Sequence, residues 1–191
     1  MSDALNPVLP PVLPLAGARF DGFVTIREAG PLGMIVLRAK PDVAGLAEAI
    51  AAATGCAVPE KRRIVLNGDR AAGWMGPDEY LLILPRAEAT VAVKTLAEKL
   101  AGQHHLAADI SDMRAVFDIE GANAGEVLMK ISPADLSILA PSELRRSRAG
   151  QVPAAFWATG QGLRIICFRS VADYMFKLLS HSAQKGSELG L

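Results

Sequence analysis

The stretch that decides the fold is W-M-G-P-D-E-Y-L-L-I-L, residues 74–84. Pro77 fixes its own φ near the value that a central position of a tight turn requires, and Gly76 and Asp78 beside it are residues that turns favour. The aromatic and aliphatic run that follows the turn is typical of a buried strand. The stretch therefore predicts a β-hairpin, and the remaining elements are placed outward from it.

Apolar residues recur at i, i+3, i+4 and i+7 in four segments, the spacing that places one stripe of a helix against a core. These segments predict helices at 42–53, 88–101, 122–131 and 170–181. The β-prone runs between them predict strands at 23–27, 34–38, 63–66, 72–75, 80–84, 114–119, 154–158 and 163–168. A short helix is also predicted to begin at Ser132, because Pro133 then takes the first helical position, where proline is favoured.

Two of the predicted strands differ in their expected surroundings. Residues 114–119 alternate charge-bearing with apolar side chains, which predicts one face turned toward water. Residues 163–168 are apolar on both faces apart from Arg164, which predicts a central strand of a sheet.

The order of these elements predicts an α+β fold made of two similar halves. Each half reads β-α-β-β-α, with helices on one face of a mainly antiparallel sheet. We place the halves at about residues 19–105 and 106–181. Residues 1–18 are predicted to be an extended proline-rich arm, which is either a frayed terminus or a segment that docks on a partner chain. Residues 182–191 are predicted to be a flexible tail.

Composition excludes several functional classes. Apolar residues make up 51% of the 191 residues, enough for a core, and 20 basic residues balance 20 acidic ones. Without an excess of Lys and Arg, no nucleic-acid partner is expected. Cys56 and Cys167 are far apart, which argues against a disulfide framework and favours a reducing compartment. No uncharged run approaches the length of a transmembrane helix, so we expect a cytoplasmic protein with no membrane partner.

Sequence motifs for nucleotide binding and catalysis are missing. No G-x-G-x-x-G pattern follows a predicted strand, and neither a G-x-x-x-x-G-K-[ST] loop nor a G-x-S-x-G nucleophile turn occurs. Neither cysteine has a nearby histidine to activate it, and His104 and His105 lack further ligands at zinc-site spacing. We therefore expect no catalytic, cofactor-binding or metal-ligating residue in this chain.

Three motifs of the sequence resemble the gamma subunit family of heterotetrameric sarcosine oxidases. They are W-x-G-P-D-E-x-L-L at 74–82, D-x-S-D-x-R at 109–114 and F-R-S-V-A-D-Y at 168–174. The resemblance spans roughly residues 20–181 and implies a fold similar to the aminomethyltransferase (glycine-cleavage T protein) folate-binding fold. The closing helix departs from the family pattern at Met175 and Phe176, where relatives often carry tryptophans, which leaves the N-methyl substrate open.

The resemblance implies a place in a complex that oxidatively demethylates sarcosine to glycine. FAD, FMN, NAD and zinc would lie on the other subunits, as would tetrahydrofolate, the acceptor of the one-carbon unit. The partners would be the alpha, beta and delta subunits, and this chain would be a non-catalytic scaffold for the large subunit. Three alternatives stay open: the equivalent subunit of an N-methylglutamate dehydrogenase, a free-standing folate-binding or aminomethyltransferase-like protein, and an assembly factor without an oxidase partner.

Two pairs of side chains on predicted hairpins are candidates for contact with a ligand or partner. Asp78 and Glu79 sit at a turn, where adjacent carboxylates could accept hydrogen bonds from the donor edge of a pterin or could serve only the turn and solubility. Trp74 and Trp157 are the only tryptophans, and each is either a core residue or an interface anchor.

Arginines supply the remaining candidates. Arg114 could bind a carboxylate of a partner or substrate, or could form a local ion pair with Asp109 and Asp112 at a turn that Ser111 organises. The only basic cluster consists of Arg145, Arg146 and Arg148. This cluster could receive an anionic glutamyl tail or an acidic patch on a neighbouring chain, or it could be a solvated loop.

Overall fold

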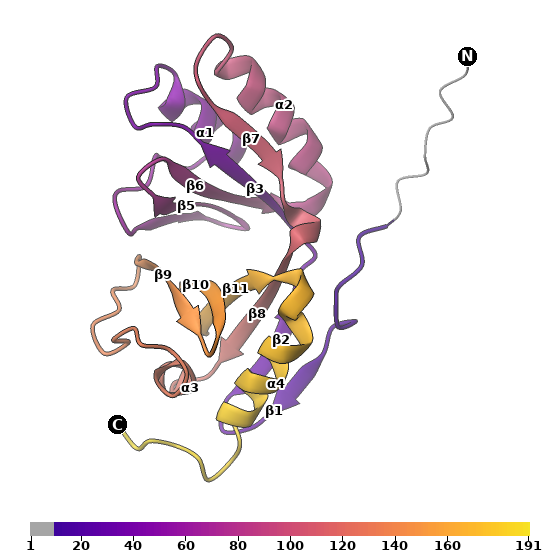
Figure 1. Ribbon diagram of the computed structural model, residues 1–191, viewed down its shortest axis with the longest axis vertical. Helices are drawn as coiled ribbons and strands as arrows, with labels where there is room; N and C mark the ends of the chain where they lie inside the picture. The colour runs from indigo at the N-terminus through magenta and orange to yellow at the C-terminus, as the bar shows by residue number, and fades with distance from the viewer. Residues whose placement is uncertain (1–9) are drawn as a thin grey trace.

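The structure, a computed structural model, describes residues 10–191 and stacks two β-sheets between two layers of helices (Figure 1). Helices α1 (Leu46–Thr54) and α2 (Ala89–Lys99) cover the outer face of the first sheet. Helices α3 (Ala124–Met129) and α4 (Ala172–Ser182) cover the outer face of the second. The strand pairings within both sheets are antiparallel. The predicted α+β class, with helices on one face of each antiparallel sheet, is confirmed.

The first sheet has the strand order β4-β5-β6-β3-β7. Its strands are β3 (Leu32–Arg38), β4 (Ile64–Asn67), β5 (Arg70–Gly76), β6 (Glu79–Pro85) and β7 (Leu106–Asp109). The hairpin predicted from the central motif is β5–β6, because Gly76 pairs with Glu79 across a two-residue loop. A bulge between Trp74 and Gly76 precedes this loop.

The second sheet has the order β1-β2-β8-β11-β10-β9. Its strands are β1 (Arg19–Asp21), β2 (Thr25–Ala29), β8 (Arg114–Glu120), β9 (Leu144–Ala149), β10 (Val152–Thr159) and β11 (Gly162–Phe168). The central position predicted for β11 is confirmed. The wet face predicted for β8 is wrong, because β8 lies between two other strands and its residues 115–119 are buried. Buried Asp118 is held by Arg27 and Arg164, each with an N–O distance of 2.6 Å.

Both sheets follow one plan, in which β4, β5, β6, β3 and β7 correspond to β9, β10, β11, β8 and β2. The second sheet therefore takes its fifth strand, β2, from the N-terminal part of the chain. The predicted division into halves differs from the structure here, since residues 19–29 belong to the second sheet and β7 to the first. Strands that are consecutive in sequence are often neighbours in a sheet, and element order alone gives no sign of such a long-range pairing.

Two local predictions are wrong. The short helix expected at Ser132 is replaced by turns, in which Ser132 Oγ accepts the Ala134 N–H at 3.3 Å and Asp135 Oδ1 accepts the Ser137 N–H at 3.0 Å. Such side chains compete with the helical backbone for its hydrogen bonds. The basic cluster lies on strand β9, at the edge of the second sheet, rather than in a loop. Charged side chains are common on edge strands, where they discourage further pairing.

The apolar residues form three clusters, and the third lies between the sheets. Two clusters fill the spaces under the helices. The third joins Met34, Ile83, Val116 and Ile166 with Trp157, which is only 2% exposed. Trp157 is therefore a core residue in this chain, whereas Trp74 is half-buried and packs at the edge of the cluster under α1 and α2.

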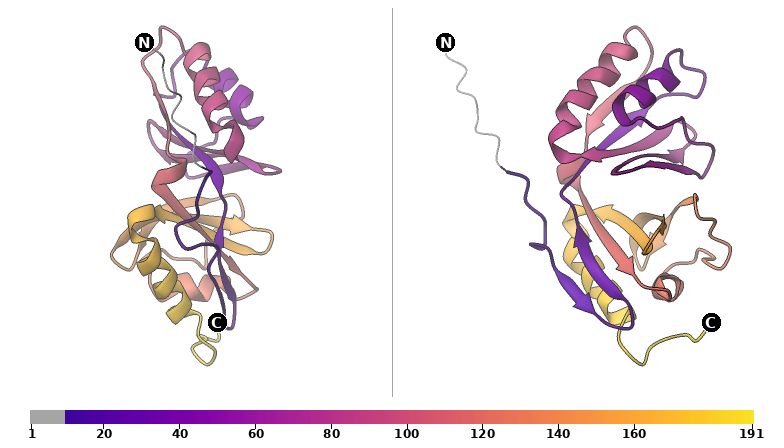
Figure 2. Two further views of the ribbon diagram at one scale, coloured as in Figure 1. Left: turned by 90° about the vertical axis from the view of Figure 1, so that its right-hand side faces the viewer. Right: turned by 180° about the vertical axis from the view of Figure 1, so that it is seen from behind.

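The described part of the N-terminal arm, residues 10–18, docks on the chain's own body. The carboxylate of Glu28, which is 3% exposed on β2, accepts the backbone N–H of Leu15 at 3.0 Å and that of Gly17 at 2.8 Å. Arg169 donates to the carbonyl of Val12 at 2.8 Å. Figure 2 shows this segment running along the junction of the two halves. The predicted arm also includes residues 1–9, which lie outside the described residues.

The C-terminal segment is held by two buried or half-buried side chains. The ammonium group of Lys130 donates to the carbonyl of Ser182 at 2.7 Å and also to the carbonyl of Ser187. Glu126, which is 5% exposed, accepts the backbone N–H of Leu189. Side chains of α3 and of the residue after it thus bind two backbone carbonyls and one backbone N–H of residues 182–191. The flexibility of this tail stays a prediction.

Replacing Trp157 by alanine tests the core between the sheets. We expect Trp157→Ala to lower the free energy of unfolding by about 3–5 kcal/mol, because a nearly fully buried indole leaves a cavity. Trp74→Ala is the matched control and should cost less, about 2 kcal/mol, because its ring is only half-buried. Urea unfolding followed by far-ultraviolet circular dichroism measures both. Equal losses for the two variants would contradict the assignment of Trp157 to the inter-sheet core.

Candidate functional site

Arg114 and Phe168 meet at the end of the core between the sheets. Arg114 begins β8, Phe168 ends β11, and the antiparallel register sets the two residues directly opposite each other. The guanidinium carbon of Arg114 lies 4.1 Å from the centroid of the Phe168 ring, within the range of a cation–π contact. Phe168 is still 41% exposed, so this stack forms part of the surface.

Strand β9 brings two further arginines to the same face of the second sheet. Directly opposed residues of antiparallel strands point to the same side, and Arg146 is opposed to Ala155 and Arg148 to Pro153. Ala155 belongs to the core between the sheets. Arg146 and Arg148 therefore face the first sheet rather than the helices.

A small hollow, which we call the inter-sheet cleft, is formed where these side chains meet the first sheet. Met75 and Glu79 line it from the first sheet, and Arg114, Arg146 and Phe168 from the second. Arg146 reaches across, with Nη1 3.4 Å from Glu79 Oε2 and 3.3 Å from the carbonyl oxygen of Met75. The cleft measures about 50 Å³, far less than the roughly 300 Å³ at which small-molecule sites begin. It has room for the tip of a side chain but not for a pterin.

The pKa of Arg114 is lowered by its surroundings in the cleft. Burial lowers the pKa of its guanidinium and the neighbouring Arg146 lowers it further, while Glu79 and Cys167 act in the opposite direction. The Nε atom of Arg114 is buried and has no hydrogen-bond partner among residues 10–191. Because an arginine stays protonated near neutral pH, this side chain holds a positive charge that no carboxylate of residues 10–191 pairs within 4.0 Å.

The local ion pair predicted for Arg114 with Asp109 and Asp112 is not formed. Arg86, which follows β6, takes both acids, with Nη2 2.7 Å from Asp112 Oδ2 and Nη1 3.5 Å from Asp109 Oδ2. Ser111 does organise the turn, because its hydroxyl and backbone N–H both donate to the carboxylate of Asp109. The strand direction explains the difference, since the first residue of β8 turns its side chain into the inter-sheet cleft and away from the preceding turn.

The two carboxylates predicted at the hairpin turn are bound by arginines of the chain itself. Asp78 Oδ2 lies 2.8 Å from Arg38 Nη2. Glu79 Oε2 lies 3.5 Å from Arg38 Nη1 and 3.4 Å from Arg146 Nη1. The pair thus serves to connect β6 with β3 and with β9.

The basic cluster predicted on residues 145–148 is divided by the alternation of the strand. Arg145 points away from the inter-sheet cleft and pairs with Glu143, at 2.8 Å between Nη2 and Oε1. Glu143 is also bound by Arg62, which precedes β4, and an isolated bridge joins Arg63 to Glu143. This network ties the edge strands of the two sheets together. Arg146 lines the cleft, and Arg148 lies on the same face of β9.

Neither cysteine is suited to nucleophilic chemistry. Burial raises the pKa of the Cys167 thiol to about 12, although nearby Arg114 acts in the opposite direction. The thiolate is the reactive form of cysteine, so this side chain is protonated at neutral pH. Cys56 is buried as well.

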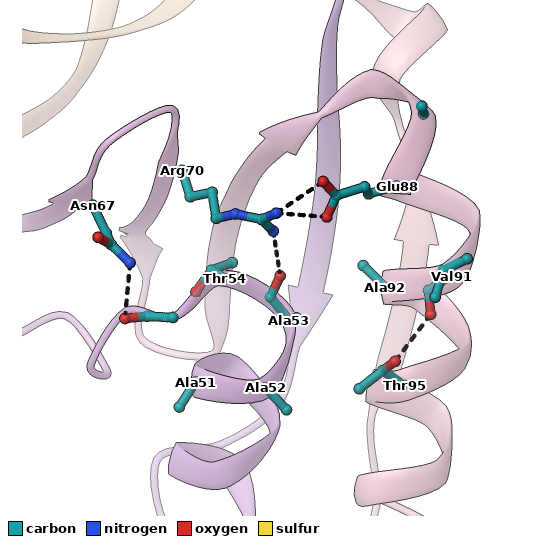
Figure 3. Close-up of a pocket in the computed structure, with 12 residues that line it drawn as sticks. Ala51, Ala52, Ala53, Thr54, Asn67, Arg70, Glu88, Val91, Ala92 and Thr95 are labelled. Atoms are coloured by element: carbon teal, nitrogen blue, oxygen red, sulfur yellow. Dashed lines mark hydrogen bonds and ion pairs between the residues drawn. The ribbon is translucent and has the colours of Figure 1, made fainter.

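A larger groove of about 530 Å³ lies outside the predicted candidates, between the C-terminal end of α1 and the side of α2 (Figure 3). Its polar side chains are used within the chain. Arg70 Nη2 lies 2.6 Å from Glu88 Oε2, and Asn67 donates to the carbonyl of Gly55 at 3.3 Å. The remaining lining is mostly alanine, valine and threonine. The groove thus presents no free charged group, and no sequence signal marked it.

Metal-binding clusters and membrane-spanning helices are both absent from residues 10–191. No group of three or more His, Cys, Asp or Glu side chains is arranged to hold a metal ion in this part of the chain. None of the helices described there is long and apolar enough to span a membrane.

Comparison with known proteins identifies relatives along most of the chain. The family model described as the sarcosine oxidase, gamma subunit family matches residues 38–185. The sarcosine oxidase subunit gamma of Corynebacterium sp. (strain U-96) is 37% identical over 159 residues, which cover 79% of this chain and 75% of that protein. The protein of the same name from Arthrobacter sp. is 33% identical over 147 residues, covering 73% of this chain and 70% of that protein.

Solved structures also resemble this chain. A chain of the heterotetrameric sarcosine oxidase from Corynebacterium sp. U-96, in complex with pyrrole 2-carboxylate, matches with a TM-score of 0.76 and 28% identity. The match covers 86% of this chain and 87% of that one. Aminomethyltransferase T of the glycine cleavage system from Bartonella henselae matches with a TM-score of 0.60 and 14% identity, over 83% of this chain and 46% of that one. The second match shows a shared fold, as the sequence predicts.

The network around Glu143 generates a pH-dependent prediction. Burial raises the pKa of Glu143, but hydrogen bonds from Arg145, Arg62 and the Ala140 backbone outweigh burial, so the pKa in the folded state is lowered. A lowered pKa stabilises the fold above the unfolded-state value of about 4.3 and ceases to do so as pH falls through the folded-state value. We expect Glu143→Gln to cost about 1–3 kcal/mol of unfolding free energy at pH 7 and progressively less below about pH 4.

Urea titrations of the wild type and the Glu143→Gln variant between pH 3 and 7 measure this difference. Asp78→Asn is the control, because the ion pair of Asp78 is half-exposed and pairs of that kind contribute about 1 kcal/mol or less. A Glu143→Gln loss that stayed constant over the whole pH range would show that Glu143 acts through packing and not through its charge.

Proposed function

This chain belongs to the sarcosine oxidase gamma subunit family, and we propose that it is the gamma subunit of a heterotetrameric sarcosine oxidase and acts there as a non-catalytic scaffold. The observation that carries the proposal is the likeness to a chain of that heterotetramer at 28% identity, over 86% of this chain and 87% of the other. In this proposal the complex oxidatively demethylates sarcosine to glycine and transfers the one-carbon unit to tetrahydrofolate.

The state of the polar side chains supports a non-catalytic role. The carboxylates of Asp78, Glu79 and Asp118 are bound by arginines. The thiol of Cys167 is protonated, because its pKa is raised to about 12. A general base or nucleophile needs a pKa near the working pH and access to a substrate. Each of these side chains lacks a suitable pKa, access to a substrate, or both. Their placement therefore favours a role in stabilising the fold.

The cofactors of the reaction are proposed to lie on the other subunits. The alpha, beta and delta subunits would carry FAD, FMN, NAD and zinc and would bind tetrahydrofolate, and the whole assembly would be cytoplasmic. The inter-sheet cleft, at about 50 Å³, does not fit a folate, since drug-sized ligands require several hundred Å³. Redox chemistry on an amine belongs to the flavin, and the protein around it supplies binding and orientation.

Co-expression with candidate flavoprotein subunits tests the proposal. We expect one complex that contains this chain and the flavoprotein subunits in a fixed ratio and that oxidises sarcosine, with N-methylglutamate as the comparison substrate. The isolated chain should show no flavin absorption and no sarcosine-dependent peroxide formation. Size-exclusion chromatography with absorbance detection, followed by a peroxide assay, measures these properties.

Two outcomes would contradict the proposal. A stoichiometric flavin spectrum from the isolated chain would exclude the scaffold role. Flavoprotein subunits that assemble equally well and turn over sarcosine with unchanged stability when this chain is omitted would show that it is not a structural subunit of the complex.

A further inference from the structure

The inter-sheet cleft carries arginines that the fold leaves without carboxylate partners. Most arginines of residues 10–191 lie within 4.0 Å of an acid, including Arg27, Arg62, Arg70 and Arg164. The arginines without such a partner in this part of the chain are Arg63, Arg114, Arg148 and Arg169. Because acidic and basic residues are equal in number, 20 of each, this local lack of acids is a feature of placement and not of composition.

Two of these arginines lie on one strip of surface, together with Arg146. The strip, which we call the arginine row, consists of Arg114, Arg146 and Arg148 and the ring of Phe168. The strand register places Arg148 and Arg146 opposite Pro153 and Ala155 of β10, and Arg114 opposite Phe168. Pro153, Ala155, Phe168 and the arginines Arg114 and Arg146 all line the inter-sheet cleft.

The charge on this strip is only partly offset from the facing sheet. Glu79 is the acid that lines the cleft, and its carboxylate is shared between Arg146, at 3.4 Å, and Arg38, at 3.5 Å. Both distances are long for a charge-assisted hydrogen bond, which is normally about 2.7–2.9 Å. Arg114 and Arg146 line the cleft with one divided carboxylate, and Arg148 adds a further positive charge on the same sheet face, so the arginine row stays positive.

The size and exposure of the strip indicate what it accommodates. The cleft, at about 50 Å³, is too small for a cofactor-sized ligand, but the side chain of Arg146 is 57% exposed and Phe168 is 41% exposed. Arginine and aromatic residues are enriched at the centres of protein–protein interfaces. A guanidinium group matches a carboxylate through two parallel hydrogen bonds. These properties fit the surface of another protein chain that presents acidic side chains.

We propose that the arginine row receives an acidic segment of a partner subunit of the sarcosine oxidase complex and that the Arg114–Phe168 stack lies at the centre of this contact. The inference rests on the proposed function, because it assigns the surface through which the chain acts as a scaffold. Aspartate or glutamate side chains of the partner bind Arg146 and Arg148 and approach the guanidinium group of Arg114, whose Nε is itself buried within the chain.

Charge reversal on β9 tests the proposal in the co-expressed complex. We expect the double variant Arg146→Glu, Arg148→Glu to weaken association with the partner subunits on the order of 30-fold or more, because like charges then face each other across the contact. Wild-type association should also weaken as salt increases, and the variant should lose most of this dependence. Lys94→Glu on the exposed side of α2 makes an equal change per residue and should alter association about threefold or less.

Melting temperatures of the isolated variants separate binding from folding. Arg148→Glu alone is the second variant, because the side chain of Arg148 forms no ion pair or hydrogen bond with another side chain of residues 10–191 that its replacement would break. It should melt like the wild type and still weaken association. If Arg148→Glu and the double variant both bound like Lys94→Glu, the arginine row would not be the docking surface.

The failures of the two proposals are distinguishable. A wild-type chain that does not assemble with flavoprotein subunits contradicts the proposed function itself. A wild-type chain that assembles while both β9 variants assemble equally tightly contradicts only the docking surface. A photoreactive amino acid at position 148 identifies the occupant, and a cross-linked partner peptide that contains aspartate or glutamate supports the proposal. A cross-link to a peptide without carboxylates, or to a second copy of this chain, overturns it.

Discussion

The structure depends on the burial of two bare sheet faces against each other. Helices cover only one side of each sheet, so the opposite sides would leave a large apolar surface in water if the halves were apart. Met34 and Ile83 from the first sheet meet Val116, Trp157 and Ile166 from the second, and these side chains are at most 4% exposed. This contact fixes the spacing of the sheets, and with it the cleft at the end of the shared core.

The path of the chain makes this contact hard to open. The chain crosses from the second sheet to the first between β2 and β3, and returns between β7 and β8. The hydroxyl of Ser111, at the second crossing, accepts the backbone N–H of Met34, at the first, at 2.9 Å. Glu143 with Arg62 joins the sheets again at their edge strands. Several separate connections therefore hold one relative position of the halves, a property that suits a scaffold.

The sequence predicts the helices and strands better than it predicts which segments and side chains contact one another. Local patterns were enough for the hairpin at Gly76, the central strand β11 and the two-halved plan, because periodicity and turn chemistry act over a few residues. Three other features depend on contacts between distant segments of the chain. They are the placement of β2, the ion pair of Asp112 with Arg86 in place of Arg114, and the burial of Asp118. The sequence does not predict strand β9, because a run of arginines is also typical of a solvated loop. The available signal is Gly150, which has a positive φ of 56° in the two-residue turn that follows the strand.

The fold alone does not decide what such a chain does, because the likeness to aminomethyltransferase T is structural and rests on 14% identity. The difference must lie in how individual polar groups are used. In this chain the buried acids Glu28, Asp118 and Glu143 bind backbone or arginine donors and so stabilise the fold. A buried charge costs several kcal/mol unless it is paired, so acids committed in this way cannot also serve a substrate. Among the arginines of residues 10–191 that lack an ion-pair partner, Arg114 lines the inter-sheet cleft and Arg148 lies on the same face of the second sheet, where another chain can reach it.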